Sequence, residues 1–585
     1  MRDFIPEGNH GRSGAVADYI AASLLGLMFI PCVLFIASLY ADLQAWRWSI
    51  PVGGAAFVPV FCLIFLRGQR LCIKLAAVAL LVLVLAKAFW LAHLFYDTSN
   101  DSMTYHADAI LQLLAGVNTI YQWMHGFDDL WVNHYPKITW YFAALVTHWT
   151  GNYNFGKIDN VMLMTAVLAY LYSFLRVRGF SAGSALLAAA AASVNPVVIS
   201  QIHTFYVDGA LASLTTLALF SGVALLGRTR CQAADSEPEA CVRPPLRHID
   251  LFVFVSSACL LINIKFTGAA MVGIIAMVDG IIWLSRWYRS RAKEDFRGGV
   301  KLVYVMVLAG LLGGVFMGYD PYIRNMLEEG NPLYPLFGAQ KTDVVAAQSP
   351  KSFNENHTST PVRVVKSIFS RAGNIIYRVG GTAEPRLKLP FSVNMEELDL
   401  YAYNDIRIGG WGVLFSGIFC CALLIYALTP ARKDAEMNAI LVMILISVLI
   451  NPGSWWARYA PQIALIPLVM VIPALASRIG RHRIAAGVVC LLLFANSALI
   501  VGPNTDEAAL ENSQIKRQIS HVLAVCGKGE YEISDTQGFH FEQILAQNGI
   551  RVVYPAEDVA KTHSKSELFP LLNVYLYKPG CKPRM

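Results

Sequence analysis

Long apolar segments separated by polar connections make up most of this chain. About thirteen of them approach the ~20 residues that a membrane-crossing helix needs, and some are shorter. They cover residues 17–40, 50–66, 72–95, 158–175, 181–200, 205–227, 249–264, 267–285, 301–318, 410–429, 437–451, 460–477 and 484–501. The pattern predicts an all-α polytopic membrane protein with about 13 transmembrane helices.

The charged residues in the connections predict how these helices are oriented. Lys and Arg gather in alternate connections, at 67–74, 176–178, 228–247, 286–301, 432–433 and 478–483. Cytoplasmic connections of membrane proteins carry an excess of these residues. We therefore expect a cytoplasmic N-terminus, and we expect the loops 96–157 and 319–409 and the C-terminal tail to lie outside.

The chain is expected to form two domains. Residues 1–502 form the transmembrane domain, with interfacial helices in its two large outer loops, including one over the aromatic-flanked stretch 138–147. Residues 503–585 alternate helix-like and strand-like segments, which predicts a small α/β domain outside the membrane. There Cys526 and Cys581 would form a disulfide in an oxidising periplasm, and two free buried thiols are the alternative.

Composition indicates lipid as the main solvent. Of 585 residues, 56% are hydrophobic and only 15% are charged, with a mean hydropathy of +0.48. Soluble domains usually contain about 25% charged residues, so this chain does not resemble one. The net charge of +7 is small for the length and concentrated in short connections, so it does not indicate a nucleic-acid partner. The eleven cysteines show no metal-site spacing.

The first outer loop begins with YDTSNDSMTYH at 96–106 and holds two candidate catalytic carboxylates, Asp97 and Asp101. Apolar positions between 103 and 114 predict an amphipathic helix with Asp101 near its start, where a helix cap is the structural alternative to catalysis. Asp101 is the first candidate for a general base. Asp97 would orient Asp101, raise its pKa, or hold a divalent cation with it.

Other charged and aromatic residues beside the apolar segments are predicted to lie on the same outer face. Charge beside a membrane span is costly, so a functional reason is expected. We interpret Arg458, Lys265 and Arg324 as ligands of a donor phosphate, because cations stabilise charge on a departing phosphate. For any one of them, an interfacial anchor is the alternative. The candidate substrate-binding residues are Tyr105, His106, Asp208, Asp320, Asn331, Tyr334, Trp455, Trp456 and Tyr459.

Short motifs in order along the chain resemble a known family. They are an apolar helix ending in Asp, DSMTYH at 101–106, KFTG at 265–268, GNPLYP at 330–335 and the Arg-Tyr pair at 458–459. This set resembles the bacterial GT-C superfamily of polytopic membrane glycosyltransferases over about residues 89–501. In one departure, the acidic loop follows the third apolar segment here, whereas it normally follows the first helix in that family.

The resemblance implies a polyprenyl-phosphate-linked sugar donor and an outward-facing site whose catalytic base falls on Asp101, with Asp97 as the alternative. The expected reaction is inverting transfer of the sugar to a glycan, lipid or protein acceptor at the outer face of the bacterial inner membrane. Metal use varies in that superfamily, so Mg²⁺ or Mn²⁺ stays open as a cofactor.

Two alternatives are an O-antigen ligase or polymerase type of enzyme, and a polytopic transporter or lipid flippase. Transporters commonly show duplicated halves and charges at the membrane midplane. The polar residues of this chain instead gather at one interface, beside two large outer loops. This distribution favours an enzyme over a transporter.

Overall fold

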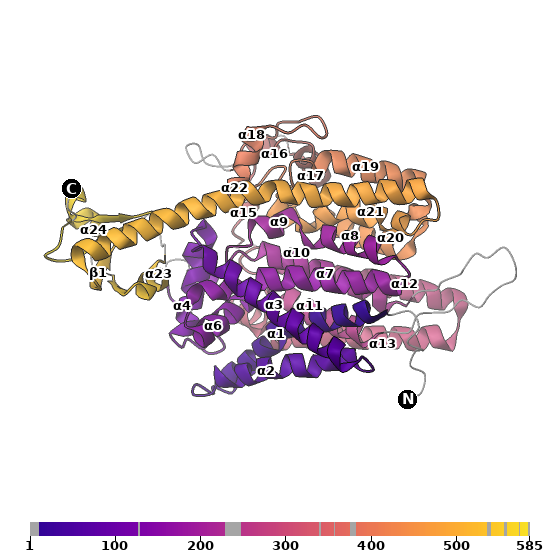
Figure 1. Ribbon diagram of the computed structural model, residues 1–585, viewed down its shortest axis with the longest axis horizontal. Coiled ribbons are helices and arrows are strands. Elements are labelled where there is room, and N and C mark those ends of the chain that lie inside the picture. The colour runs from indigo at the N-terminus through magenta and orange to yellow at the C-terminus, as the bar shows by residue number, and fades with distance from the viewer. Residues whose placement is uncertain are drawn as a thin grey trace.

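A computed structural model shows a bundle of helices with a small sheet at one end (Figure 1). It describes residues 11–126, 129–227, 247–338, 341–355, 357–374, 382–534, 540–554, 559–572 and 574–582. Within these ranges, eight helices are long and apolar enough to cross a membrane, and five more apolar helices have 10–17 residues. Each predicted apolar segment contains one of them, which confirms a polytopic helical membrane protein.

The helices of the bundle are apolar on most sides because they face either lipid or one another. They are α1 (Gly11–Tyr40), α2 (Ser49–Cys62), α3 (Leu71–Leu94), α7 (Asp159–Val177), α8 (Ala182–Ser193), α9 (Pro196–Ser200), α10 (Asp208–Leu225), α11 (His248–Ile262), α12 (Phe266–Ser290), α13 (Lys293–Gly310), α19 (Phe415–Leu428), α20 (Ala435–Ile450), α21 (Ile466–Leu475) and α22 (Gly480–Cys526). Helices α2 and α3 expose apolar side chains such as Phe57 and Leu75, as expected of a lipid-facing surface.

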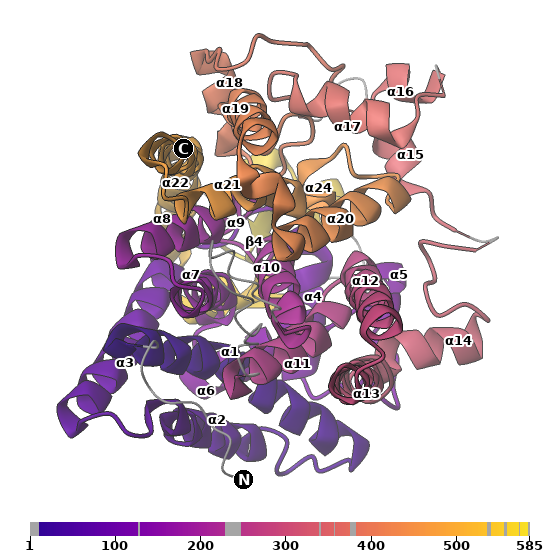
Figure 2. The ribbon, with the colours of Figure 1, turned by 90° about the vertical axis from the view of Figure 1, so that its right-hand side faces the viewer.

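Helix α10 lies in the middle of the bundle. Figure 2 shows it surrounded by α7, α11, α12 and α20, and all of its residues except Leu225 are buried. A charged residue on such a helix has no access to water unless it lies at an end. Asp208 is the first residue of α10, at such an end, but it is itself buried and therefore needs partners within the protein.

The two large loops form short helices rather than open coil. The first loop contains a π-helical turn (Ser102–His106), α4 (Ala107–Leu114), α5 (Asp129–His134) and α6 (Ile138–Thr150), and the second contains α14 (Arg324–Glu328), α15 (Val344–Gln348), α16 (Lys351–Glu355), α17 (Thr360–Ile368) and α18 (Met395–Asp399). The predicted interfacial helix corresponds to α6, whose residues from Ile138 to Thr147 are buried by protein. Helix α6 is therefore an internal support of the first loop.

Helix α22 joins the bundle to the C-terminal domain without a break. It runs the length of the bundle and continues beyond it to the sheet (Figure 1), so the boundary predicted at 502 falls inside this 47-residue helix. The sheet has the order β2-β1-β4-β3, with β1 parallel to β2 and antiparallel to β4. Its elements are β1 (Gly529–Ile533), α23 (Glu542–Gln547), β2 (Ile550–Val553), α24 (Val559–Thr562), β3 (Phe569–Leu571) and β4 (Val574–Tyr577). The small α/β domain is thus present.

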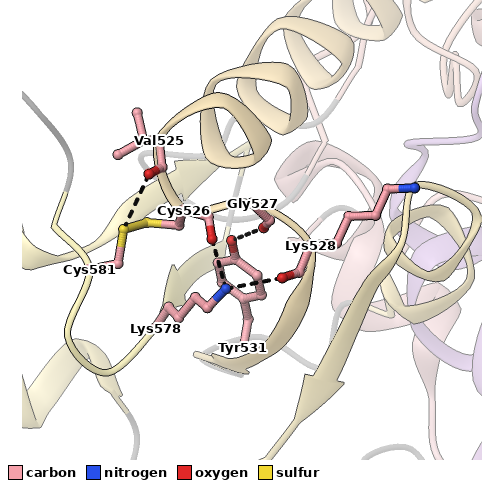
Figure 3. Close-up of a disulfide and its surroundings, with 7 residues drawn as sticks. All are labelled: Val525, Cys526, Gly527, Lys528, Tyr531, Lys578 and Cys581. Atoms are coloured by element: carbon pink, nitrogen blue, oxygen red, sulfur yellow. Dashed lines mark hydrogen bonds between the residues drawn. A yellow bond between two sulfur atoms is a disulfide. The ribbon is translucent and has the colours of Figure 1, made fainter.

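A disulfide joins the last residue of α22 to Cys581, which follows β4 (Figure 3). Cys526 and Cys581 are bonded, with their Cα atoms 5.9 Å apart. Lys578 donates hydrogen bonds from Nζ to the carbonyl oxygens of Cys526, at 2.8 Å, and Lys528, at 3.1 Å. These hydrogen bonds hold together the two chain segments that the disulfide joins. All four strands lie within the loop that the disulfide closes.

We expect this disulfide to form in cells and to stabilise the domain. Closing a loop of 55 residues contributes about 4 kcal/mol by the chain-entropy relation. Under denaturing conditions, a thiol-reactive mass tag should label neither Cys526 nor Cys581 before reduction, and Cys526→Ser should lower the unfolding temperature as much as the double serine variant does. Labelling of both thiols without reductant would contradict the disulfide.

The Lys and Arg pattern predicts that the C-terminal domain lies outside the cytoplasm. Because α22 continues to Cys526, a reporter should follow the last residue and leave that helix intact. Alkaline phosphatase fused there should be active, and a fluorescent protein that matures only in the cytoplasm should be dark. A matched fusion after Gly227 should give the reverse pattern. Active phosphatase at 227 and inactive phosphatase at the C-terminus would invert the topology.

Candidate functional site

The centre of the candidate site is Arg458, which lies in a short turn (Ala457–Tyr459) between α20 and α21. Its Nε donates to Asp208 at 2.9 Å, and its Nη2 donates to Asp101 at 2.6 Å. Its Nη1 lies 3.4 Å from a carboxylate oxygen of Asp405. Every nitrogen of this buried guanidinium therefore faces a carboxylate, and the planar fork fixes their relative directions.

Asp208 is bound by two cations. Its Oδ1 lies 2.6 Å from Nζ of Lys265, the residue that precedes α12, and its Oδ2 receives Arg458 and Nε2 of Gln201. The Asp208 side chain is 0% exposed. A buried carboxylate is tolerated only when charges and hydrogen bonds compensate for lost water, and these three donors do so. Asp208 is thus an internal counter-ion with no exposed side-chain surface.

Asp101 is the most exposed of the three carboxylates around Arg458, slightly more so than Asp405. Its side chain is 22% exposed, and Oδ2 receives Arg458 and, at 3.4 Å, the hydroxyl of Tyr105. In the part of the chain that the structure describes, Oδ1 has no hydrogen-bond partner. Burial raises the pKa of Asp101, but the charge and hydrogen bond of Arg458 outweigh it and hold that pKa below its usual range. Asp101 is therefore ionised at neutral pH, with one oxygen free to accept a proton.

The helix-cap interpretation of Asp101 is not what the structure shows. Asp101 precedes the π-helical turn, but its side chain accepts no capping hydrogen bond from that turn. A cap requires the carboxylate to accept a backbone N–H two or three residues later. Instead, the carboxylate points to Arg458 on a distant part of the chain.

Aromatic rings form the walls around these charges. The guanidinium carbon of Arg458 lies 4.6 Å from the ring centre of Tyr206, and Nζ of Lys265 lies 4.2 Å from that of Tyr459. The indole Nε1 of Trp456 donates to Asp405 at 2.6 Å. Cations over aromatic faces are stabilised by the ring quadrupole, so the predicted residues Trp456 and Tyr459 hold the charged groups in place.

His106 contributes an unused hydrogen-bond donor beside the site. Its Nδ1 accepts from Nε1 of Trp140 at 2.6 Å, and because an indole only donates, the proton of the neutral imidazole is on Nε2. Among the described residues, Nε2 has no partner although the side chain is buried. Burial lowers the pKa of His106 to about 3, so the ring is neutral at physiological pH. Its ring centre lies 6.3 Å from that of Tyr206, the wall beneath Arg458.

Asp97 is not part of the Arg458 cluster. Its Oδ1 accepts from the backbone N of Ser99 at 3.0 Å, and its Oδ2 accepts from the backbone N of Phe205 at 2.6 Å. These bonds attach the first outer loop to the connection between α9 and α10. Burial raises the pKa of Asp97, and the charge of Lys157 only partly opposes this shift. Asp97 therefore positions the loop that carries Asp101.

The donor set does not fit a divalent cation held by Asp97 and Asp101. Both oxygens of Asp97 already accept backbone hydrogen bonds, and Asp101 is paired with Arg458. Over the described ranges, no group of three or more His, Cys, Asp and Glu side chains is placed to hold a metal ion. We therefore assign no step to a metal.

Arg324 and Asp320 lie in a second buried cluster. Asp320 is paired with Lys137 at 2.9 Å, and Arg324 donates to the carbonyl oxygens of Thr119, at 3.0 Å, and Gln122, at 2.9 Å. Among the described residues, neither Asp320 nor Arg324 forms a hydrogen bond or ion pair with Asp101 or Arg458. Their charges connect the first outer loop to the second.

Three further predicted residues shape the surrounding loops. Asn331 forms hydrogen bonds within its own loop, to Leu333 and Phe337. The ring centres of Tyr334 and His134 lie 4.8 Å apart in an edge-on arrangement. Trp455 is fully buried, and its ring centre lies 5.7 Å from that of Phe353. Trp455 therefore offers no surface to a ligand.

Three further residues, Asp405, Tyr206 and Gln201, belong to the site but were not among those predicted from the sequence. Asp405 lies in NDIRIGG, just before the apolar segment that forms α19. Like Asp101, Asp405 is a charged residue close to an apolar segment, so the same pattern could have identified it. The length of the second loop concealed which of its many polar residues return to the bundle.

No protein-family model matches the chain, and no curated protein matches it. Among solved structures, the chain is similar to the crystal structure of ArnT from Cupriavidus metallidurans bound to undecaprenyl phosphate. The sequence identity is 10%, the match covers 83% of this chain and 87% of that chain, and the TM-score is 0.43.

The ion pair between Asp101 and Arg458 should make stability depend on pH. Because the folded-state pKa of Asp101 is lowered, its stabilising contribution is complete above the ordinary aspartate pKa of about 3.9 and is lost as pH falls through the folded-state pKa. Asp101→Asn should therefore lower the unfolding temperature at pH 7, with a difference from wild type that shrinks toward pH 3. The exposed Asp399→Asn serves as the matched control. A difference that stays constant with pH would contradict the pairing.

Proposed function

We propose that this protein is a membrane glycosyltransferase that moves a sugar from a polyprenyl-phosphate-linked donor to a glycan, lipid or protein acceptor. The observation that carries the proposal is the Asp101–Arg458 pair, an ionised and partly exposed carboxylate held by a buried guanidinium beside Lys265. The motifs at 101–106, 265–268 and 458–459 supply three of the charged side chains, in agreement with the family resemblance.

Asp101 acts as the general base in this proposal. Oδ1 takes the proton of the acceptor hydroxyl as the acceptor oxygen attacks the anomeric carbon of the sugar. The bond from that carbon to the phosphate oxygen breaks, and the polyprenyl phosphate leaves with the electron pair. A single displacement of this kind inverts the configuration at the anomeric carbon.

Lys265 and Arg458 would receive the departing phosphate in different ways. An ammonium has three donors, and Lys265 spends one on Asp208, so it can bind a phosphate oxygen and keep that pair. Arg458 has five N–H donors and faces three carboxylates, so a phosphate can bind a remaining N–H or replace Asp101 or Asp405. Replacement of Asp101 would remove its counter-ion, raise its pKa and make it a stronger base when the donor is bound.

The proposed location is the bacterial cytoplasmic membrane, with the site on the periplasmic side. The Lys and Arg distribution supports this orientation. The pairing of Cys526 with Cys581 supports it independently, since disulfides persist in oxidising compartments.

One observation favours a second candidate, a polytopic transporter. Asp279 lies within α12, is 0% exposed, and has two carboxylate oxygens without a partner among the described residues. Ionisable residues inside membrane spans commonly mark ion or substrate pathways. In a transporter, Asp279→Asn would abolish function, whereas the transferase needs Asp101.

The test is sugar transfer by the purified protein, given a polyprenyl-phosphate sugar and an acceptor extract. Wild type should release polyprenyl phosphate, and Asp101→Asn should do so on the order of 10²–10⁴-fold more slowly, because Asn keeps the shape but cannot take the proton. Asp279→Asn should stay active. Uptake into vesicles without donor cleavage, lost in Asp279→Asn, would instead support the transporter.

Asp97→Asn is the matched control in the same loop. The amide would place a donor against the backbone N–H of Phe205 or of Ser99, so the protein should be less stable. Added Mg²⁺ or Mn²⁺ should not raise the rate of sugar transfer by Asp97→Asn. Restoration by either cation would show that Asp97 is a metal ligand.

A further inference from the structure

The loop that carries Asp101 also contributes to the core of the C-terminal domain. Met103, two residues after Asp101, is 1% exposed and belongs to the apolar cluster of that domain. The other buried members of the cluster all come from residues beyond 514: Ile515, Ile519, Val522, Tyr531, Ile533, Phe541, Ile544, Leu545, Ile550, Phe569, Leu571, Val574 and Leu576. The first outer loop therefore contributes one fully buried side chain, Met103, to a core built mainly by the end of the chain, and Tyr96 packs against the same core.

Polar contacts hold the same loop to the C-terminal part of α22 and to the domain. The backbone N of Tyr96 donates to Oδ1 of Asn512 at 3.3 Å, and Thr98 donates to the carboxylate of Glu511. The backbone N of His540 donates to the carbonyl oxygen of Met103 at 2.8 Å. Asp101 thus lies between two attachment points, one on each side of it in the sequence.

The turn after Asp101 separates Met103 from the catalytic side chains. Thr104 has non-helical backbone angles (φ −91°, ψ −110°), and its hydroxyl donates to the carbonyl oxygens of Asn100, at 3.0 Å, and Asp101, at 3.2 Å. Tyr105, which follows the kink, donates its hydroxyl hydrogen to Asp101. Met103, which precedes the kink, packs in the core of the C-terminal domain. Any movement of Met103 out of the domain would therefore move the backbone of Asp101.

We propose that the C-terminal domain positions the catalytic carboxylate, with Met103 as the positioning residue that couples the two. Met103 packs in the core of the domain, and this packing fixes the turn that follows Asp101. The fixed turn holds the Asp101 carboxylate against Arg458. The catalytic part of this assignment rests on the proposed function. The coupling itself rests on the contacts of Met103, Tyr96 and Thr98 with the C-terminal region.

The test compares Met103→Ala with Met28→Ala, which truncates another fully buried methionine, in α1. Met103→Ala should lower kcat on the order of 10²-fold, the effect of displacing a catalytic group by about 1 Å. Donor KM should change far less, because Lys265 and Arg458 lie on other elements. Met103→Leu, which keeps the volume, should restore kcat. Equal kcat in Met103→Ala and Met28→Ala would overturn the proposal.

A second measurement does not depend on activity. Hydrogen exchange of the backbone amides of residues 97–106 should be faster in Met103→Ala than in wild type or Met28→Ala. Unchanged exchange would overturn the coupling, even if activity fell. If wild type transfers no sugar while exchange responds as expected, the proposed function fails and the coupling stands.

A milder variant covers the case in which Met103→Ala does not fold. Asn512→Ala removes only the hydrogen bond to Tyr96 and should give a smaller increase in exchange over the same segment. Exchange that stays at the wild-type rate in this variant would count against the attachment.

Discussion

The candidate site depends on one buried guanidinium. Arg458 joins Asp101 of the first outer loop, Asp208 at the start of the central helix α10, and Asp405 of the second loop. Removing a charge from water is costly, and the cost is offset only when its partners surround it. Four distant parts of the chain therefore have to meet at one point for any of these charges to be buried.

This arrangement separates positioning from chemistry. Asp208 is fully enclosed and receives two cations, so it organises the site without reacting. Asp101 is held through one oxygen only, and its other oxygen is free among the described residues. The same Arg458 contact that fixes Asp101 in direction also keeps it ionised, which its proposed role as a general base requires.

The second buried cluster shows the contrast. Nζ of Lys137 donates to Asp320 and to the carbonyl oxygens of Asn133 and Tyr135, which uses all three of its donors. A saturated ammonium has no capacity for a ligand, so this cluster connects loops. Buried charged residues of the two clusters thus have different roles, which follow from how many of their hydrogen-bonding sites are already occupied.

The sequence by itself determined the membrane class, the positions of the helices and four of the charged residues from which the site is built. Lipid requires long apolar segments, and charge next to them is rare enough to identify Asp101, Asp208, Lys265 and Arg458.

Only the tertiary structure decided which charges meet. In the structure, Asp97 accepts backbone hydrogen bonds, Arg324 lies in a separate cluster, and Asp405 is a third partner of Arg458. Helix α22 continues past residue 502 into the domain whose core contains Met103. A sequence pattern does not distinguish between charged residues at the same side of the membrane. The spacing of residues along one helix or loop does not give the angle at which the next helix packs, so it cannot show which of these residues meet.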